Sequence, residues 1–340
     1  MIRHGALGAA VAALALVAAL PLSPLAAEAP TSCEVATETE IFTQIKDAIG
    51  LPNSHKDVRD LPEEEASCLE TEAGCVETIQ ICHHHFCTQY NFATKLPDWV
   101  IERLTPDIVT GDNTRPHVKF KPDPKLADKK LSAKDKDYAG SGLARGHQAA
   151  SADFKFDSQC MKDTFIFSNA VPQVQNGFNG GIWRELESHV QNLAKHRDEI
   201  YVITGPVEMA PDGAEIVIPE GNNACGQRIV LAGLSKLKKQ SICNANDKDP
   251  SKVCEDGVAV PAGLFKIVYI PETERAFGFL MSNEDHRELK DDDISSEAYF
   301  EEWRATIQAI EEAANLEFFT NLSLRESRTR KTHCTETRWR

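Results

Sequence analysis

The chain of 340 residues has no excess of basic charge. Its 37 Lys and Arg residues stand against 52 Asp and Glu residues, which gives a formal net charge of −15 at pH 7. Domains that bind nucleic acid mainly through charge are usually basic, so this balance argues against a simple nucleic-acid-binding module. The sequence also shows no internal repeat. A comfortable membrane span is missing as well, because the one apolar run, residues 6–20, is ended by Pro21 and Pro24.

An N-terminal leader is the first feature that is present. Arg3 and His4 form a short basic region before the apolar run, and the small residues Ala26 and Ala27 offer a cleavage site. We therefore predict a signal peptide over residues 1–27 and a secreted or periplasmic protein.

Ten cysteines support export. All of them follow the leader and their number is even, so we expect disulfides in an oxidising compartment. The pairing stays open, with Cys243–Cys254 as one candidate for a local loop. The cysteines are Cys33, Cys68, Cys75, Cys82, Cys87, Cys160, Cys225, Cys243, Cys254 and Cys334.

The charge is distributed unevenly along the chain. Nine Lys or Arg stand against four Asp between Arg115 and His147, and a second basic cluster lies at residues 325–331. Acidic residues concentrate at 57–77 and 284–302. Two interpretations fit this pattern, a local basic groove on an acidic body and ordinary solvated surface charge.

Helical and strand patterns are mixed without a regular β-α-β alternation, which predicts an α+β fold. Amphipathic spacing predicts helices over residues 38–49, 180–195 and 296–314. Residues 105–139, rich in Pro, Asp and Lys, indicate a long loop. The expected strands lie within 78–91 and 98–104, at 164–169 before a turn at Pro172, at 199–204 ended by Gly205-Pro206, and at 215–217, 264–269 and 275–281.

One constellation contains most of the chemistry-bearing side chains. It consists of Ala144-Arg145-Gly146-His147, Ser168-Asn169, Pro172-Gln173, Asn179, Trp183 and Leu186-Glu187. It offers an imidazole, a guanidinium, a neutral amide and a carboxylate. Cutting a phosphodiester with a hydrated metal ion requires such groups, because a base must activate water, a cation must hold the phosphate and a ligand must seat the metal.

The constellation resembles the signature of the DNA/RNA non-specific endonucleases, a family that includes secreted bacterial nucleases and mitochondrial endonuclease G. The similar residues cover about 76–323 and close with Leu316-Glu317-Phe318-Phe319. The resemblance implies a central antiparallel sheet flanked by helices, with a ββα-metal finger as the active site. It also implies Mg2+-dependent cleavage of both DNA and RNA that leaves 5′-phosphate ends.

The resemblance implies catalytic roles for four side chains. His147 is the expected general base, because an imidazole titrates near neutral pH and needs neither burial nor special tuning to take a proton from water. Arg145 is expected to hold the phosphate with a bidentate fork. Arg115, matched by a Thr-Arg pair alone, is expected to stabilise developing charge. Asn169 is expected to hold the site together by hydrogen bonds.

Asn179 is the expected metal ligand. Mg2+ prefers octahedral oxygen ligands and keeps most of its waters, so a single amide oxygen suffices; Mn2+ is the alternative ion. Glu187 is expected to orient the metal-bound waters.

Ala144 departs from the family signature, which has Asp at this position. In the family that carboxylate supports the metal site, so its loss puts the metal affinity, the rate or the choice of metal in question. We therefore keep an alternative function, a nuclease-like domain with lost or reduced catalysis that acts as a binding or structural module.

The run Cys82-His83-His84-His85-Phe86-Cys87 also offers zinc ligands. Adjacent side chains on a strand point to opposite faces, so the three histidines could not all reach one ion. We prefer a disulfide-bearing strand and keep a zinc-stabilised binding protein as a second alternative.

The complete prediction has four segments. They are a signal peptide (1–27), an acidic N-terminal extension with one helix (28–75), the nuclease domain (76–323) and a basic C-terminal tail (324–340). The expected partners are DNA and RNA, bound through the phosphate backbone rather than base edges. No membrane is expected after the leader is removed, and a homodimer and a protein inhibitor are left open.

Overall fold

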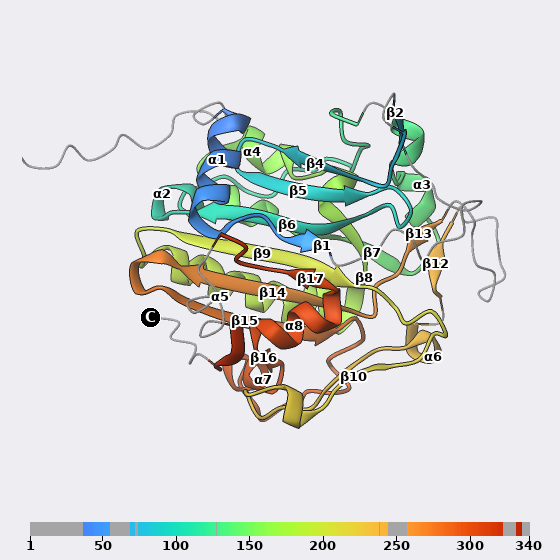
Figure 1. The fold of residues 1–340 in the computed structure, drawn as a ribbon, viewed down its shortest axis with the longest axis vertical. Helices are drawn as coiled ribbons and strands as arrows, with labels where there is room; N and C mark the ends of the chain where they lie inside the picture. The colour runs from blue at the N-terminus through green and yellow to red at the C-terminus, as the bar shows by residue number, and fades with distance from the viewer. Residues whose placement is uncertain are drawn as a thin grey trace, which may run out of the picture.

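The computed structural model describes residues 37–54, 69–71, 74–126, 128–237, 239–243, 257–321 and 331–334. Its centre is a seven-stranded antiparallel sheet with the strand order β16-β15-β14-β9-β6-β5-β4 (Figure 1). The predicted α+β fold with a central antiparallel sheet is therefore confirmed. In chain order the strands are β4 (Thr78–Cys82), β5 (Phe86–Asn91), β6 (Leu96–Leu104), β9 (Ile200–Val207), β14 (Gly263–Ile270), β15 (Arg275–Ser282) and β16 (Arg304–Ala305).

The sheet buries both of its faces. Side chains alternate along a strand, so Val100 and Leu104 of β6 enter one hydrophobic core while Trp99 and Ile101 enter the other. Strands β9 and β14 alternate in the same way, and every residue of both strands is buried. The sheet is therefore the middle of three layers.

Helices α1 (Glu38–Ile49) and α8 (Ile307–Ala314) cover one face, in front of the sheet in Figure 1. The predicted helix over residues 38–49 is confirmed. Its start is fixed by a capping box in which Thr37 and Glu40 bond to each other's backbone amide groups. Gly50 follows with a φ of 70°, a value that favours glycine. The helix buries Ile41, Ile45 and Ile49 against the sheet.

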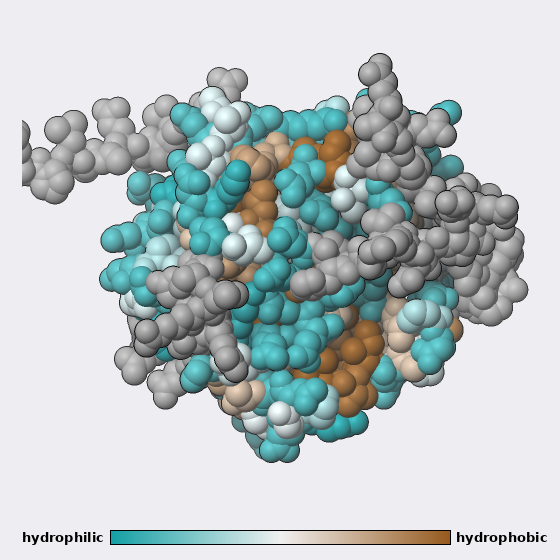
Figure 2. All heavy atoms as spheres, in the orientation of Figure 1, coloured by the Kyte–Doolittle hydropathy of each residue, from teal (hydrophilic) through white to brown (hydrophobic). Residues whose placement is uncertain are grey.

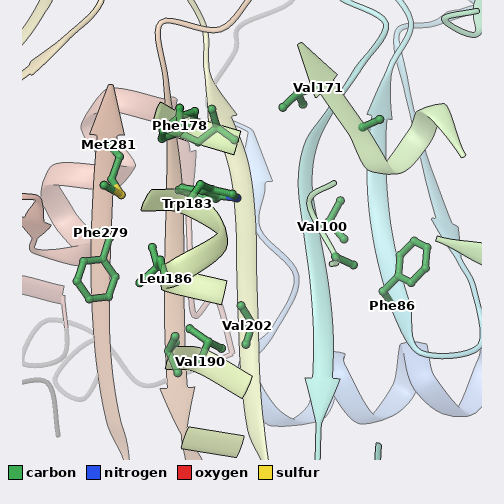
Figure 3. Close-up of a cluster of buried hydrophobic side chains, with 14 of the residues drawn as sticks. Phe86, Val100, Val171, Phe178, Trp183, Leu186, Val190, Val202, Phe279 and Met281 are labelled. Atoms are coloured by element: carbon green, nitrogen blue, oxygen red, sulfur yellow. The ribbon is translucent and has the colours of Figure 1, made fainter. Parts of the chain in front are cut away.

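Helix α5 (Trp183–Ala194) covers the opposite face. Its Trp183, Leu186 and Val190 lie on one side of the helix and point toward β9, β14 and β15 (Figure 3). In that core they join Val202 and Phe279 of the sheet.

A β-hairpin precedes α5 and belongs to the same layer. Strands β7 (Leu143–His147) and β8 (Ala170–Val174) form a separate antiparallel pair, and the irregular helical turn η5 (Gln175–Ile182) connects β8 to α5. Ala170 and Val171 anchor the hairpin in the α5-side core. The hairpin and the helix together form a ββα unit, as the resemblance to the family implies.

The remaining elements are short and surround these layers. Small antiparallel pairs are β1 (Asn53–Ser54) with β17 (Leu316–Glu317), β2 (Leu69–Thr71) with β3 (Gly74–Val76), β10 (Ile216–Ile218) with β11 (Ile229–Leu231), and β12 (Ser241–Ile242) with β13 (Val258–Ala259). The short helices are α2 (Pro106–Val109), η2 (Lys129–Leu131), α3 (Asp135–Tyr138), η3 (Ser151–Phe154), α4 (Ser158–Asp163), η4 (Phe167–Asn169), η6 (Glu220–Asn222), α6 (Leu234–Leu237), η7 (Pro271–Thr273) and α7 (Ser296–Glu302).

The predicted strand at 164–169 and the turn at Pro172 are wrong. Residues 167–169 form η4, and the strand β8 begins after them with Pro172 inside it, opposite Arg145. Proline is tolerated there because β8 pairs with a strand on one side alone, so no ladder bond is lost on the other.

Two element boundaries also differ from the prediction. Strand β9 continues through Gly205-Pro206, which we expected to end it. The predicted helix over 296–314 is two helices, α7 and α8, because Ser295 and Thr306 each cap a separate N-terminus and β16 lies between them.

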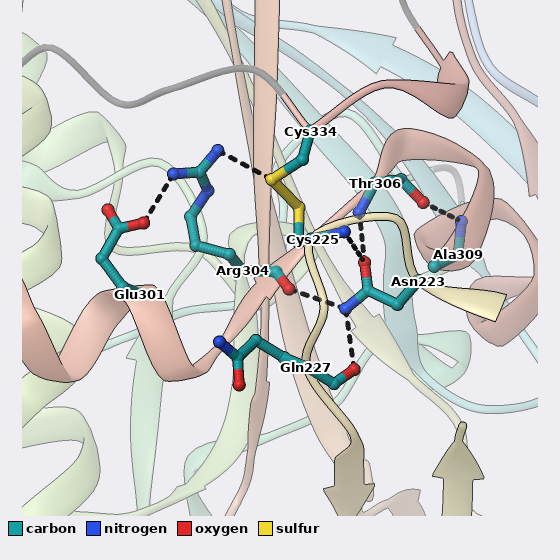
Figure 4. The surroundings of a disulfide bond; sticks show 8 residues. All are labelled: Asn223, Cys225, Gln227, Glu301, Arg304, Thr306, Ala309 and Cys334. Carbon is teal, nitrogen blue, oxygen red and sulfur yellow. Dashed lines mark hydrogen bonds and ion pairs between the residues drawn. A yellow bond between two sulfur atoms is a disulfide. The ribbon is translucent and has the colours of Figure 1, made fainter. Parts of the chain in front are cut away.

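Disulfides are present, as predicted. Cys82 pairs with Cys87 and Cys225 with Cys334, and no cysteine in the described part of the chain is free. The second bond fastens residues 331–334 beside Arg304, whose guanidinium contacts both Glu301 and the Cys334 sulfur (Figure 4). Cys254 lies outside the described residues, as do the predicted leader and most of the basic C-terminal cluster.

The surface is mostly polar, as expected for a chain in which 26% of the residues are charged. The face in Figure 2 is mostly hydrophilic, with a few small apolar areas. No helix in the described ranges is both long and apolar enough to cross a membrane.

Candidate active site

The β7–β8 hairpin places Arg145 and His147 on the same face of β7, opposite Pro172 and Ala170. Arg145 is held from outside the hairpin by α3. Its Nη2 lies 2.8 Å from the Asp135 carboxylate and donates to the Asp135 carbonyl oxygen at 2.7 Å. Its guanidinium lies 5.0 Å from the centre of the Tyr138 ring. The Asp135 carboxylate is half exposed, so a phosphate could replace it as the partner of this arginine.

His147 is buried, with 6% of its surface exposed. Phe120 and Phe165 pack against the imidazole with ring centres 4.7 and 4.6 Å away. Burial, and then the nearby positive charge of Arg115, lower the pKa of His147 to about 3. The pKa of this imidazole therefore lies well below the near-neutral value from which we argued its role, because Phe120 and Phe165 exclude water from it.

Burial keeps His147 in its neutral form across the physiological range. Its Nε2 has no hydrogen-bond partner among the described residues. A neutral imidazole with an unpartnered nitrogen can accept a proton from a water molecule that enters the site.

Asn169 is fully buried and bonds to backbone groups. Its Nδ2 donates to the carbonyl oxygens of Ala149 and Thr164, both at 3.0 Å, and its Oδ1 accepts from the Ala149 amide at 2.8 Å. These bonds fix the turn that follows His147, so the residue supports the site rather than facing a substrate.

Asn179 lies in η5, where the backbone departs from helical geometry. Gly177 there has a φ of 76°, and a Cβ at this residue would lie 1.8 Å from the Asp285 carboxylate, so glycine is required on both grounds. Asn179 is half-buried, and its Nδ2 donates to Gln175 Oε1 at 3.1 Å. This bond engages the amide nitrogen and leaves the oxygen as the atom that could bind a cation.

Glu187 follows on α5 and is half-buried. Burial raises the pKa of its carboxyl to about 8, although the positive charges of Lys266 and Arg115 act in the opposite direction. Without a cation the carboxyl is thus largely neutral at pH 7. A bound divalent cation would favour the ionised form.

Arg115 comes from the loop between α2 and η2, yet its charge acts on both His147 and Glu187. Its guanidinium lies 5.1 Å from the centre of the Phe165 ring, and the side chain is exposed. The tertiary structure thus brings Arg115, His147 and Glu187 together from three separate segments.

Gln173 is a residue of the hairpin for which we predicted no role. It lies opposite Ala144 in the hairpin and is fully buried, and no described residue bonds to its amide nitrogen or oxygen. Its side chain occupies the space beside Gly146, where a Cβ would come within 2.1 Å of it. With Ala at position 144, the buried Gln173 amide has no carboxylate opposite it, whereas an Asp at this position could supply one.

The zinc alternative at residues 82–87 is not supported. The histidines lie in the turn between β4 and β5 rather than in a strand, and the Cys82–Cys87 disulfide uses both thiols. His83 is bound instead to Asp123, whose Oδ2 lies 2.9 Å from the His83 Nε2.

The donor atoms near the hairpin fit a hard divalent cation. They are oxygens, from the Asn179 amide and the Glu187 carboxyl, which Mg2+ and Mn2+ prefer. No group of three or more His, Cys, Asp or Glu is arranged to hold a metal within the described ranges. A cation here would therefore depend on Asn179 and on water.

The raised pKa of Glu187 predicts a pH-dependent stability for the metal-free protein. An acid with a raised folded-state pKa stabilises the fold at low pH, and this contribution is lost as pH rises toward about 8. Between pH 6.5 and 8 we expect the free energy of unfolding to fall by on the order of 1 kcal/mol from Glu187. The buried histidines do not mask this, because their lowered pKa values act below pH 6.5.

Urea unfolding in EDTA at the two pH values measures this change. Glu187→Gln should reduce the dependence without abolishing it, because burial also raises the pKa of Glu102 well above its ordinary value. Glu185→Gln on the same helix should keep the dependence of the wild type. An equal slope in the wild type and Glu187→Gln would contradict the assignment.

The sequence is similar to a known family of proteins and to individual members with known names. The family model of the DNA/RNA non-specific endonucleases matches residues 71–324. The nuclease EXOG, mitochondrial, of Homo sapiens is 29% identical over 247 residues, which cover 71% of this chain and 57% of that protein. The chain thus spans little more than half of that relative's length. The endonuclease G, mitochondrial, of Caenorhabditis elegans is 27% identical over 303 residues, or 83% of this chain and 85% of that protein.

A solved structure supports the fold comparison. A chain in the crystal structure of the EndoG/EndoGI complex, which describes the mechanism of EndoG inhibition, matches with a TM-score of 0.55 and 25% identity. The match covers 75% of this chain and 89% of that chain.

The prediction of a secreted or periplasmic protein is wrong. Relatives from human, mouse, yeast and nematode are named mitochondrial nucleases. Signal peptides and mitochondrial targeting segments share part of their composition, because the latter are also poor in acidic residues and contain Arg. Residues 1–27 fit both kinds, since they contain Arg3 and no acidic residue.

The order of the motif, the ββα unit on an antiparallel sheet and the extent of the family match lead to one conclusion: the chain belongs to the DNA/RNA non-specific endonuclease family.

Proposed function

We propose that this protein is a metal-dependent endonuclease that hydrolyses phosphodiester bonds in DNA and RNA without sugar specificity. The observation that supports this most directly is the His147 imidazole, buried, neutral and unpartnered at Nε2, on the ββα unit that also presents Asn179 and Glu187. The nuclease names of the relatives agree with it. They do not favour the alternative, a non-catalytic binding or structural module.

In the proposed reaction, His147 removes a proton from a water molecule as its oxygen bonds to phosphorus. The bond from phosphorus to the 3′ oxygen breaks in line, the 3′ oxygen takes a proton from solvent water to become a hydroxyl, and the other product carries a 5′-phosphate. Arg145 exchanges its Asp135 contact for the phosphate, and Arg115 approaches the developing charge. A bound Mg2+ or Mn2+, held by Asn179 with waters that Glu187 orients, would stabilise the leaving oxygen.

The low pKa of His147 is compatible with a base that acts after substrate binds. Part of the lowering comes from the positive charge of Arg115. A phosphate at Arg115 and Arg145 would offset that charge and favour the imidazolium. The basicity of His147 would then rise when a substrate is present.

The first functional prediction concerns this base. His147→Ala should reduce cleavage of a supercoiled plasmid in Mg2+ by about 10² to 10⁴-fold, the usual contribution of a general base. His117→Ala is the matched control, because that histidine is exposed in the neighbouring basic stretch. Circular dichroism verifies the folds. Retention of more than about a tenth of the activity by the folded His147→Ala protein would contradict the role.

A second prediction follows from the unpartnered amide of Gln173. Ala144→Asp should lower the Mg2+ concentration that gives half-maximal cleavage, because the carboxylate can accept from Gln173 and attract the cation. Ala144→Asn has the same size without the charge and should leave the metal titration close to that of the wild type. Identical titrations for the Asp and Asn variants would show that charge at this position does not matter.

The third prediction concerns docking of nucleic acid. The acidic body repels phosphates, so binding needs the basic stretch at residues 115–136, where Lys119 and Lys121 are exposed. Lys125, in the same stretch, is instead paired with Glu38. Salt screens the repulsion, and it also weakens phosphate contacts. We therefore expect an activity optimum at modest salt, followed by a fall.

Changing Lys119 and Lys121 together to Gln should flatten this fall and raise the KM with little effect on kcat. Lys46→Gln with Lys195→Gln removes the same charge from exposed positions on α1 and beside α5, so it serves as the control. A double variant of the basic stretch with the wild-type salt profile would place the binding surface elsewhere.

A further inference from the structure

His286 is a buried histidine in the loop that follows β15, with 1% of its surface exposed. Its Nε2 lies 2.7 Å from the Ser282 carbonyl oxygen, and its Nδ1 lies 2.8 Å from the Tyr299 hydroxyl. Burial lowers the pKa of His286, so the ring is neutral near pH 7. Because a carbonyl oxygen can only accept, Nε2 carries the single proton and Nδ1 accepts from the tyrosine. Both nitrogens are thus satisfied, and the orientation of the ring is fixed.

The imidazole of His286 lies against Phe178 of η5. The two rings are stacked, with centres 5.2 Å apart and planes inclined by 20°. Phe178 also contacts Trp183, the first residue of α5, with ring centres 5.4 Å apart, and Figure 3 shows these two rings next to each other. Phe178 is itself completely buried. It is therefore held both by the loop after β15 and by the start of α5.

Two further residues of the same loop contact the chain between β8 and η5. Asn283 Oδ1 accepts from the Val174 amide at 2.9 Å, and its Nδ2 donates to the Pro172 carbonyl oxygen at 3.1 Å. The Asp285 carboxylate occupies the space beside Gly177, where a Cβ would lie 1.8 Å from its Oδ1. The loop after β15 therefore follows the chain from β8 into η5 and contacts it in both elements.

The turn η5 depends on such contacts because its own backbone is irregular. Asn176, Gly177 and Gly181 have non-helical φ and ψ angles. Glycines restrict the backbone little, so a turn of this composition has no strong preference for one conformation. The position of Asn179 within it must therefore be set by packing. Phe178, the residue immediately before it, provides a buried ring for this packing.

We propose that His286 is a positioning residue for the cation site. Tyr299 and Ser282 fix the orientation of its imidazole. The imidazole stacks on Phe178 and thereby holds the following residue, Asn179, where its amide oxygen can bind a divalent cation. The inference deepens the proposed nuclease function and rests on it for the role of Asn179, whereas the coupling of His286 to η5 can be tested without that function.

Hydrogen exchange of the full-length, metal-free protein, measured by mass spectrometry, tests the coupling. His286→Ala should speed exchange in the peptide that covers residues 175–182, because Phe178 loses its stacking partner. Exchange in β9 should stay at the wild-type level. Phe318→Ala is the matched control, since it removes a ring contact to Phe265 in the core on the opposite face of the sheet. It should leave exchange in residues 175–182 unchanged.

The consequence for the cation is measured by Mn2+ binding, followed through the electron paramagnetic resonance signal of free Mn2+. We expect His286→Ala to raise the dissociation constant about tenfold, and Tyr299→Phe to raise it less because the tyrosine only orients the ring. Phe178→Leu should also weaken binding. The double variant His286→Ala, Phe178→Leu should bind no more weakly than the weaker single variant, because both changes break the same stack. Phe318→Ala should keep the wild-type affinity.

Asn179→Ala distinguishes the inference from the proposed function. If this variant binds Mn2+ as the wild type does, the proposed cation ligand is wrong, and the exchange data still test the coupling of His286 to η5. Where Asn179→Ala weakens binding, a wild-type affinity in folded His286→Ala would overturn the inference. Wild-type exchange over residues 175–182, or losses that add in the double variant, would overturn it as well. If His286→Ala does not fold, Tyr299→Phe decides, and wild-type exchange and affinity in that variant would contradict the positioning role.

Discussion

Helix α5 has to bury one side against the sheet and present the other to the active site, and the remaining features of the site depend on this packing. Trp183, Leu186 and Val190 insert into the core with the side chains of β9, β14 and β15. Glu187 follows Leu186 directly, so its carboxyl is brought to the edge of that core, where burial raises its pKa. The packing that fixes the helix therefore also desolvates the Glu187 carboxyl, which acts in its ionised form in the proposed mechanism.

Desolvation also governs the histidine. The walls formed by Phe120 and Phe165 exclude water from His147 and hold its imidazole neutral. In the free protein this imidazole is a weak base, but at neutral pH almost all of it is in the neutral form that can accept a proton. The two arginines also affect the protonation of His147. The positive charge of Arg115 makes the imidazolium less favourable, and a phosphate bound between Arg115 and Arg145 would make it more favourable. In the proposed mechanism, substrate binding would therefore raise the basicity of His147 through the charge of Arg115.

Buried amides hold the hairpin in shape. Asn169 ties the turn after His147 to the backbone, and Asn283 joins β8 to the end of β15 by bonds to Val174 and Pro172. Gln173 is the exception, since its amide faces no partner in the described structure opposite Ala144. The unpartnered amide thus lies opposite Ala144, the residue that departs from the family signature.

The sequence by itself determined the order of the motif and the helix at 38–49, because these depend on local spacing and local capping, whereas the ββα unit before α5 was expected only from the resemblance to the family. The tertiary structure decided the rest of the site. Sequence gave no means to see that Phe120 and Phe165 would bury His147, or that β8 could contain Pro172 because it pairs on one side alone. A pKa and a pairing partner are set by what surrounds a group in space, and for these residues the surroundings come from parts of the chain far apart in sequence.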